Sequence, residues 1–215
     1  MFIGHFGVAL AAKKAAPRVS LGTLILATSW IDLVWPILLL LGIEHVRIVP
    51  GITALTPLEF TDYPFTHSLV MVIVWGLLLG GAYFLVTPSV KGSVVVGSVV
   101  VSHWLLDWLT HRPDLPLYPD GPKAGLGLWN SVPLAIAVES LIFVVGVLLY
   151  YRATRAKDRI RTWSFWALIA ALVFFYIINI VGPPPPDEKT LAWFALAAWL
   201  FPVWGYWIDR HRMAM

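Results

Sequence analysis

The sequence contains no cysteine and few charged residues. Without cysteine the chain can form neither disulfides nor thiolate metal sites and nucleophiles. Charged residues make up 13% of the 215 residues, whereas 59% are hydrophobic. Soluble domains usually carry about 25% charged residues, so roughly half of the usual charge is missing. We also find no convincing internal repeat. This composition excludes an ordinary water-soluble domain and indicates a membrane protein.

Six apolar runs are long enough to cross a bilayer, which takes about 17 to 25 helical residues. They cover residues 21–42, 67–86, 92–109, 131–151, 162–181 and 190–208. A shorter run at 2–12 would reach only about 16 Å as a helix, too short for a full crossing, and we expect it to enter the bundle. The sequence therefore predicts an all-α fold, a polytopic membrane helix bundle with six spans plus a short N-terminal helix. We expect a single integral membrane domain, with a site-bearing half at 1–130 and supporting helices at 131–215.

The basic residues indicate how the bundle is oriented. A net charge of +3 could suggest a nucleic-acid partner, but the lysines and arginines lie in short loops between the apolar runs. If the loop with Lys13 and Lys14 is cytoplasmic, eleven of the fifteen Lys and Arg residues fall on that side. This asymmetry follows the positive-inside rule. It predicts a multi-pass plasma-membrane protein with a cytoplasmic C-terminus and no nucleic-acid partner. The oligomeric state stays open.

One apolar run carries polar residues at a regular spacing. In VSHWLLDWLTHRP, the residues His103, Asp107 and His111 recur at every fourth position. Positions i, i+4 and i+8 of a helix share one face. Ionisable groups inside a membrane cost free energy, about 2.5 to 3.5 kcal/mol for a charge at the bilayer centre, and usually face a bundle interior. Three such groups on one face exceed what helix association requires, and they favour a metal site or a catalytic site.

Further ionisable residues are expected at a similar depth. Counted from the cytoplasmic end at 1.5 Å per residue, Asp32 and His103 both lie about 16 Å into their spans, and Asp107 about 22 Å. His67 opens its span from the opposite side, and His5 joins if the N-terminal run enters the bundle. Imidazole nitrogens and carboxylate oxygens are ligands of zinc and related divalent ions. A bound cation would also neutralise the buried carboxylates.

The segments GHFG, SWID, DYPFTHS and SHWLLDWLT, within residues 1–119, resemble the LexA-regulated, membrane-bound metal-dependent hydrolase family. The order of the polar residues is also similar to the ligand order of zinc-dependent phospholipase C. That similarity implies one metal site made by Asp32, His67, His103 and Asp107, with Asp107 bridging to a second ion near His5. The later HxxxE pair of the soluble enzymes has no counterpart, so no third ion is expected.

The resulting hypothesis is a metal-dependent hydrolase with one or two divalent ions, Zn²⁺ first and Mn²⁺ or Mg²⁺ as alternatives. Activated water would attack a phosphoester, phosphodiester or ester bond of a lipid or amphiphile near the extracytoplasmic leaflet. Asp62, His111 and Glu139 are candidates for catalytic roles. Asp62, five residues before His67, could orient that imidazole or be a plain loop acid, His111 could instead be a solvated histidine or contact a phosphate, and Glu139 could be a protonated structural group. Arg112 and Lys123, in the loop at 112–127, are expected to bind an anionic head group.

Two other classes of function fit the same residues. Intramembrane Asp, Glu and His also form pathways for protons or divalent metals. A polar seam can instead hold helices together in a membrane scaffold. The last two apolar runs carry no ionisable residue in their interiors, which favours a site on one side of the membrane over a path through it.

Overall fold

The structure is a computed structural model that describes residues 1–156, 159–210 and 212–214. Its α-helices are α1 (Ile3–Ala15), α2 (Leu21–Thr28), α3 (Trp30–Leu40), α4 (Leu69–Val86), α5 (Val90–Thr110), α6 (Val132–Ala153), α7 (Arg159–Val181), α8 (Glu188–Leu196) and α9 (Leu200–Arg210). Short pieces connect them: β1 (His45–Ile48), β2 (Leu58–Asp62), β3 (Leu115–Pro116), β4 (Lys123–Ala124), η1 (Leu128–Asn130), β5 (Thr154–Ala156), η2 (Ala197–Trp199) and β6 (Arg212–Ala214).

The described residues form an all-α membrane bundle, as predicted. Five helical segments are long and apolar enough to span a bilayer: α4, α5, α6, α7 and the stretch Glu188–Arg210 that combines α8, η2 and α9. The bent pair of α2 and α3 is apolar enough to be a sixth span if the two helices cross the membrane as one broken span. The described residues thus give five to six candidate spans plus the short N-terminal α1, in line with the predicted bundle, and the helix ends differ from the predicted ones by a few residues.

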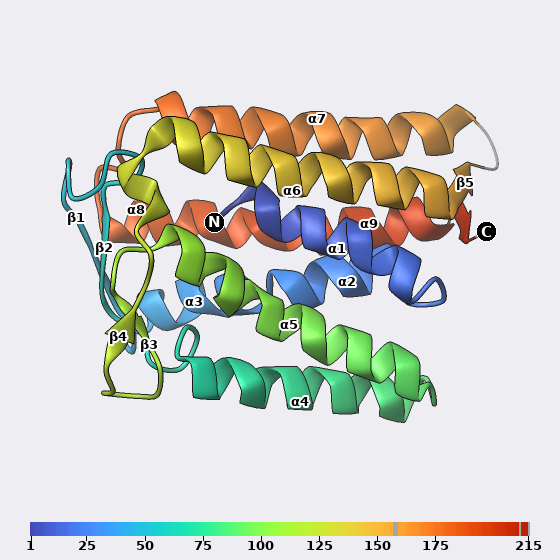
Figure 1. Ribbon diagram of the computed structural model, residues 1–215, viewed down its shortest axis with the longest axis horizontal. Helices are drawn as coiled ribbons and strands as arrows, with labels where there is room; N and C mark the ends of the chain where they lie inside the picture. The colour runs from blue at the N-terminus through green and yellow to red at the C-terminus, as the bar shows by residue number, and fades with distance from the viewer. Residues whose placement is uncertain (157–158, 211, 215) are drawn as a thin grey trace.

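Helix α1 runs through the middle of the bundle, between α6 on one side and α2 and α5 on the other (Figure 1). Phe6 and Leu10 of α1 are buried in the core. Where α1 crosses α6, the backbones of Gly7 and Gly146 are in contact. A Cβ atom added at Gly146 would lie 2.1 Å from the carbonyl oxygen of Gly7. Small residues at a helix crossing allow such close approach, and here they allow a helix too short for a full span to reach the interior.

The expected continuous span at 21–42 is wrong in one respect, because the helix breaks at Ser29. Helices α2 and α3 meet at an angle of 52°. The carbonyl of Thr28, the last residue of α2, lies 2.5 Å from Nδ1 of His103 on α5. A carbonyl at a helix end has no intrahelical donor, so the bend frees it for a side chain of another helix. Pro36, inside α3, has no backbone N–H, so one more hydrogen bond of the helical backbone is missing in this span.

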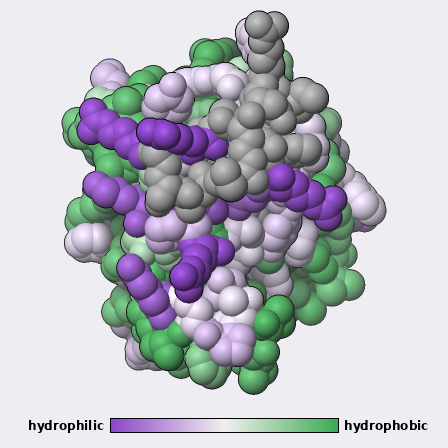
Figure 2. Space-filling model, turned by 90° about the vertical axis from the view of Figure 1, so that its right-hand side faces the viewer, coloured by the Kyte–Doolittle hydropathy of each residue, from purple (hydrophilic) through white to green (hydrophobic). Residues whose placement is uncertain are grey.

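The two ends of the bundle differ in structure. The antiparallel pairs β1–β2 and β3–β4 cover one end, and β5–β6 lies at the other (Figure 1). Figure 2 views the β5–β6 end, where hydrophilic residues gather inside a hydrophobic rim. Exposed basic residues of the helix ends and loops there include Lys14, Arg18, Lys91 and Arg152. These four residues of the predicted basic side thus lie at one end of the bundle, whereas Lys157 lies outside the described residues.

Candidate metal centre

Helix α5 supplies the first two residues of the site. His103 and Asp107 are both buried, and His103 Nε2 lies 2.9 Å from Asp107 Oδ2. The other imidazole nitrogen, Nδ1, donates to the carbonyl of Thr28. A hydrogen bond at one ring nitrogen leaves the lone pair of the other available and fixes the orientation of the ring. The bend after α2 therefore determines how His103 presents Nε2 to the site.

Asp32 enters the site from the first turn of α3, directly after that bend. Its Oδ2 lies 3.5 Å from Nε2 of His103, and its Oδ1 lies 3.4 Å from Nε2 of His67. The same break in the helix thus places Asp32 beside α5 and orients His103.

His67 lies in the loop between β2 and α4, and a chain of polar groups orients it. Its Nδ1 is 2.7 Å from the hydroxyl of Thr66, which donates to the carboxylate of Glu44 at 2.7 Å. Glu44 is fully buried, and it also accepts the backbone N–H groups of Phe65 and Thr66. The hydroxyl of Thr66 has only one proton, so the imidazole donates to it from Nδ1. Nε2 of His67 then faces Asp32 with its lone pair.

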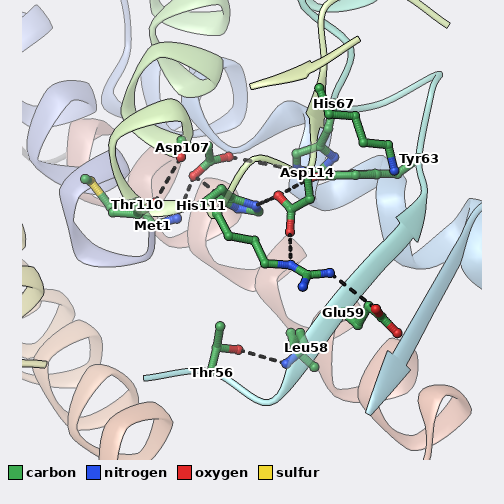
Figure 3. A network of polar contacts seen from close by, with 12 residues as sticks. Met1, Thr56, Leu58, Glu59, Tyr63, His67, Asp107, Thr110, His111 and Asp114 are labelled. Carbon is green, nitrogen blue, oxygen red and sulfur yellow. Dashed lines mark hydrogen bonds and ion pairs between the residues drawn. The ribbon is translucent and has the colours of Figure 1, made fainter. Parts of the chain in front are cut away.

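His5 reaches the site from α1. Its Nε2 lies 3.1 Å from Oδ1 of Asp107, and its ring stacks on that of His103 at 3.6 Å between centroids. The amino nitrogen of Met1 is 2.6 Å from the same Asp107 oxygen (Figure 3). Glu139 of α6 anchors this end of α1, because its carboxylate accepts the backbone N–H of Phe2 at 2.7 Å and that of Gly4 at 3.5 Å. A carboxylate at a helix N-terminus satisfies donors that the helix cannot.

The five predicted ligands therefore converge. They form two overlapping groups, His5 with His103 and Asp107, and Asp32 with His67 and His103, in which all ligand atoms lie within 4.8 Å of one another. Two atoms that each bind one zinc ion at about 2.1 Å lie at most about 4.2 Å apart, and about 3.4 Å apart in a tetrahedron. The closest pairs in the site measure 2.9 to 3.5 Å.

A polar atom without a hydrogen bond also supports the fit. Nε2 of His103 is buried and has no hydrogen-bond partner among the described residues, although carboxylate oxygens of Asp107 and Asp32 lie close to it. Buried polar groups are rarely left without a partner. A cation between the imidazole and the carboxylates would satisfy this nitrogen. The donor set of imidazole and carboxylate suits zinc, and with fewer imidazoles engaged it suits Mn²⁺.

Access to the site is uneven. The side chains of His5, His67, His103 and Asp107 are at most 3% exposed, whereas that of Asp32 is 43% exposed. Of the five side chains, that of Asp32 is therefore the one in contact with the surroundings of the bundle, and the other four are buried.

His111 forms a second polar network next to the cluster (Figure 3). Its Nε2 lies 4.0 Å from Oδ1 of Asp107, and its Nδ1 donates to Asp114 at 3.0 Å. Asp114 also accepts the hydroxyl of Tyr63 at 3.1 Å and Nε of Arg112 at 3.3 Å. Burial lowers the pKa of His111, and the hydrogen bond to Asp114 opposes that effect. Burial raises the pKa of Tyr63 well above its usual value, and the charge of Asp114 adds to this, so the phenol stays a donor.

The remaining predicted residues lie outside the cluster. Asp62, at the end of β2, is half exposed and pairs with His45 at 3.6 Å, so it does not orient His67; the hydroxyl of Thr66 contacts that imidazole instead. Lys123 of β4 is exposed and donates to the carbonyl of Thr61. Arg112 is one-third exposed and sits between Asp114 and Glu59, at 3.3 Å from each.

Sequence reasoning missed the groups that orient the imidazoles. Thr28, Glu44, Thr66, Tyr63 and Asp114 were not predicted as site residues. Two of them had a local signal: Thr66 precedes His67 directly, and Asp114 follows His111 by three residues. Glu44 lies more than 20 residues from His67 and is brought to it only by the fold.

These features define a class: an integral membrane protein, built as a helix bundle, with a buried cluster of histidines and aspartates near one end. The model of the YdjM inner membrane protein family matches residues 3–183, and the chain belongs to this family. The match supports a multi-pass protein of the plasma membrane and is consistent with the resemblance to the LexA-regulated membrane family. No curated protein and no solved structure matches the chain.

Proposed function

We propose that the protein is a membrane-embedded, metal-dependent hydrolase. The observation that carries this proposal is the convergence of five imidazole and carboxylate side chains from α1, α3, α5 and the loop before α4, at the spacings that one or two divalent ions require. Asp32, His67 and His103 would hold one ion, and His5 and Asp107 would hold a second, because Nε2 of His103 has a single lone pair and can bind one ion only. A bound divalent ion supplies Lewis acidity and lowers the pKa of water.

His111 has the position of a proton acceptor in this scheme. Its Nδ1 is held by Asp114, so Nε2 carries the lone pair and faces the cluster across 4.0 Å from Asp107. A neutral imidazole with a fixed tautomer takes a proton from water as a general base. The lowered pKa keeps His111 neutral at physiological pH. Asp114 orients this imidazole and stabilises the cation that forms on proton transfer.

The substrate in this proposal is a lipid or another amphiphile with a phosphoester, phosphodiester or ester bond. The cluster lies near the end of the bundle that carries β1–β4, away from the basic end seen in Figure 2. If the basic end is cytoplasmic, the cluster faces the extracytoplasmic leaflet. Arg112 and Lys123 lie on the same end and supply positive charge there for an anionic head group, although Arg112 already pairs with two carboxylates.

Metal analysis of the purified full chain tests the proposal first. Prepared in metal-free buffers after expression with zinc, the wild type should retain one or two ions per chain by elemental analysis. Asp107→Asn, which is nearly isosteric, should lose most of this metal, and so should His103→Ala. Asp62→Asn is the matched control, because it removes a carboxylate outside the cluster, and it should bind as the wild type does. A metal-free wild type would leave the polar seam as a structural element and reject the proposal.

Hydrolysis of a water-soluble phosphodiester, bis-p-nitrophenyl phosphate, and of a p-nitrophenyl ester then separates the two bond classes. The metal-loaded wild type should cleave one of them, and Asp107→Asn should not. Transport is tested on the same preparation, because zinc uptake into proteoliposomes without any hydrolysis would assign the cluster to a metal pathway instead.

A further inference from the structure

An apolar groove of about 590 Å³ lies between α6 and α7, with Ile3 of α1 in its lining. The volume is that of a typical small-molecule site, about 300 to 1,000 Å³. Its lining is almost entirely aliphatic and aromatic, and both long helices that form it span the membrane. A groove of this kind in a bilayer is in contact with lipid chains, so the question is whether it is built to hold one of them.

The groove has a closed end and an end near the site. Toward the basic end of the bundle, Tyr150 of α6 stacks on Phe165 of α7 at 4.8 Å, and Tyr151 lies against Trp166 at 6.2 Å. These aromatic pairs bring the two helices together where the lining of the groove stops. At the other end, the lining includes Ile3, which is two residues from His5.

The groove is somewhat longer than one leaflet. Its lining extends from Ile136 to Leu148 on α6 and from Trp166 to Val181 on α7, which is about 18 and 22 Å of helix at 1.5 Å per residue. One leaflet contributes about 15 Å to a hydrocarbon core of about 30 Å. A single acyl chain that enters at the end near the cluster would therefore fill the groove as far as the aromatic pairs.

A buried hydroxyl marks the part of the groove near the site. Tyr176 of α7 lines the groove and is only 5% exposed, and its hydroxyl has no hydrogen-bond partner among the described residues. Its ring stacks on Phe2, next to the start of α1. A buried hydroxyl without a partner costs free energy unless a bound group accepts its hydrogen bond. The carbonyl of an acyl ester is an acceptor that occurs at the head of a lipid chain.

We propose that the groove between α6 and α7 holds an acyl chain of a membrane glycerolipid, with the hydroxyl of Tyr176 donating to the ester carbonyl at the head of that chain. This inference rests on the proposed function, which makes the cluster a hydrolytic site, and it names the substrate class of that site as an acylated lipid. The tail of the lipid lies in the groove, and its polar part reaches the cluster past the start of α1. The groove supplies binding energy remote from the reacting bond, and Tyr176 sets the depth of the lipid.

The test is lipid retention by the full chain in native mass spectrometry, with diacyl phosphatidylglycerol added to the detergent-purified protein. Val144 and Val145 of α6 are both exposed, but only Val144 lines the groove. Val144→Trp should therefore lower retention of the lipid at least about tenfold, the effect of displacing about two methylenes. Val145→Trp is the matched control and should retain the lipid as the wild type does. Equal retention by the two variants would overturn the inference, because the bound lipid would then be only part of the general lipid shell.

A second comparison tests the hydroxyl. The wild type should prefer the diacyl lipid to the dialkyl ether lipid with the same head group by about fivefold, the effect of one hydrogen bond. Tyr176→Phe should abolish that preference while retaining the ether lipid as the wild type does. An unchanged preference in Tyr176→Phe would refute the role of Tyr176. A groove filled by a second copy of the chain would give a dimer that retains no lipid, and would also overturn the inference.

These measurements need neither metal nor turnover, so the two proposals fail separately. Retention by the wild type that Val144→Trp loses, in a protein that binds no metal, would support the groove and reject the hydrolase. A metal-loaded protein that cleaves bis-p-nitrophenyl phosphate but shows no difference between Val144→Trp and Val145→Trp would support the hydrolase and reject the groove.

Discussion

Replacement of Gly146 by alanine should weaken metal binding although Gly146 contacts no ligand of the site. A Cβ atom at this position of α6 would lie 2.1 Å from the carbonyl oxygen of Gly7 and 2.7 Å from its Cα. Restoring an ordinary contact of 3.4 Å requires α1 to move by about 1.3 Å. His5 is two residues from Gly7 on the same short helix, so it moves with it.

The displacement is large on the scale of metal coordination. Nε2 of His5 lies 3.1 Å from Oδ1 of Asp107, and a shift of about 1.3 Å would bring this distance to as much as about 4.4 Å. Two ligands of one zinc ion cannot be more than about 4.2 Å apart. We therefore expect the zinc affinity to fall about 10- to 100-fold, the range seen when groups that orient a ligand are removed, and the thermal stability in detergent to fall with it.

Gly81 provides the control. It lies in α4, and a Cβ atom there meets nothing within 4 Å. On helix propensity alone, glycine to alanine stabilises a helix by about 1 kcal/mol. Gly81→Ala should therefore keep or raise stability and bind zinc as the wild type does in a competition assay with a chromophoric chelator. Wild-type zinc affinity in Gly146→Ala would show that the position of α1 does not control the site.

Three further predictions concern the groups around the cluster. Thr66→Val removes the hydroxyl between Glu44 and the imidazole of His67 and should lower zinc affinity about 10- to 100-fold; Thr61→Val, at an exposed hydroxyl, should not change it in the same chelator competition. Glu139→Ala should detach the start of α1 and reduce the metal content measured by elemental analysis, whereas Glu139→Gln keeps an acceptor for the Phe2 N–H and should restore it; equal metal loss in both would contradict an anchoring role. His111→Gln should lower the turnover of the cleaved test substrate about 100-fold with an unchanged zinc content; unchanged turnover would remove His111 from the mechanism.

Most of the helices, and the convergence of the five predicted ligand candidates, could be predicted from the sequence because both depend on local signals. Apolar run length determined the spans, and the spacing of His103 and Asp107 placed both side chains on one face of α5. Counting residues from the membrane surface then placed Asp32 at a similar depth. The short N-terminal helix could be predicted to enter the bundle, and Gly7 and Gly146 show how it does so.

What the sequence did not reveal depends on contacts between distant segments. The bend at Ser29 lies within a run that is apolar enough to be predicted as one helix, and it is coupled to the hydrogen bond between Thr28 and His103, which are 75 residues apart. Glu44 could not be distinguished from an ordinary loop acid because polar residues are expected near the membrane surface. For the same reason Asp62, five residues before His67 in sequence, was a plausible partner, but the fold directs its side chain toward His45.

The exposure of Asp32 has a consequence for the order of events at the site. The other four side chains are buried, so we expect an entering ion to contact Asp32 first. Under the proposed function, an amphiphile bound at the ion would cover the same exposed carboxylate. We therefore expect a chelator to strip the metal slowly when an amphiphile is bound and quickly when it is absent.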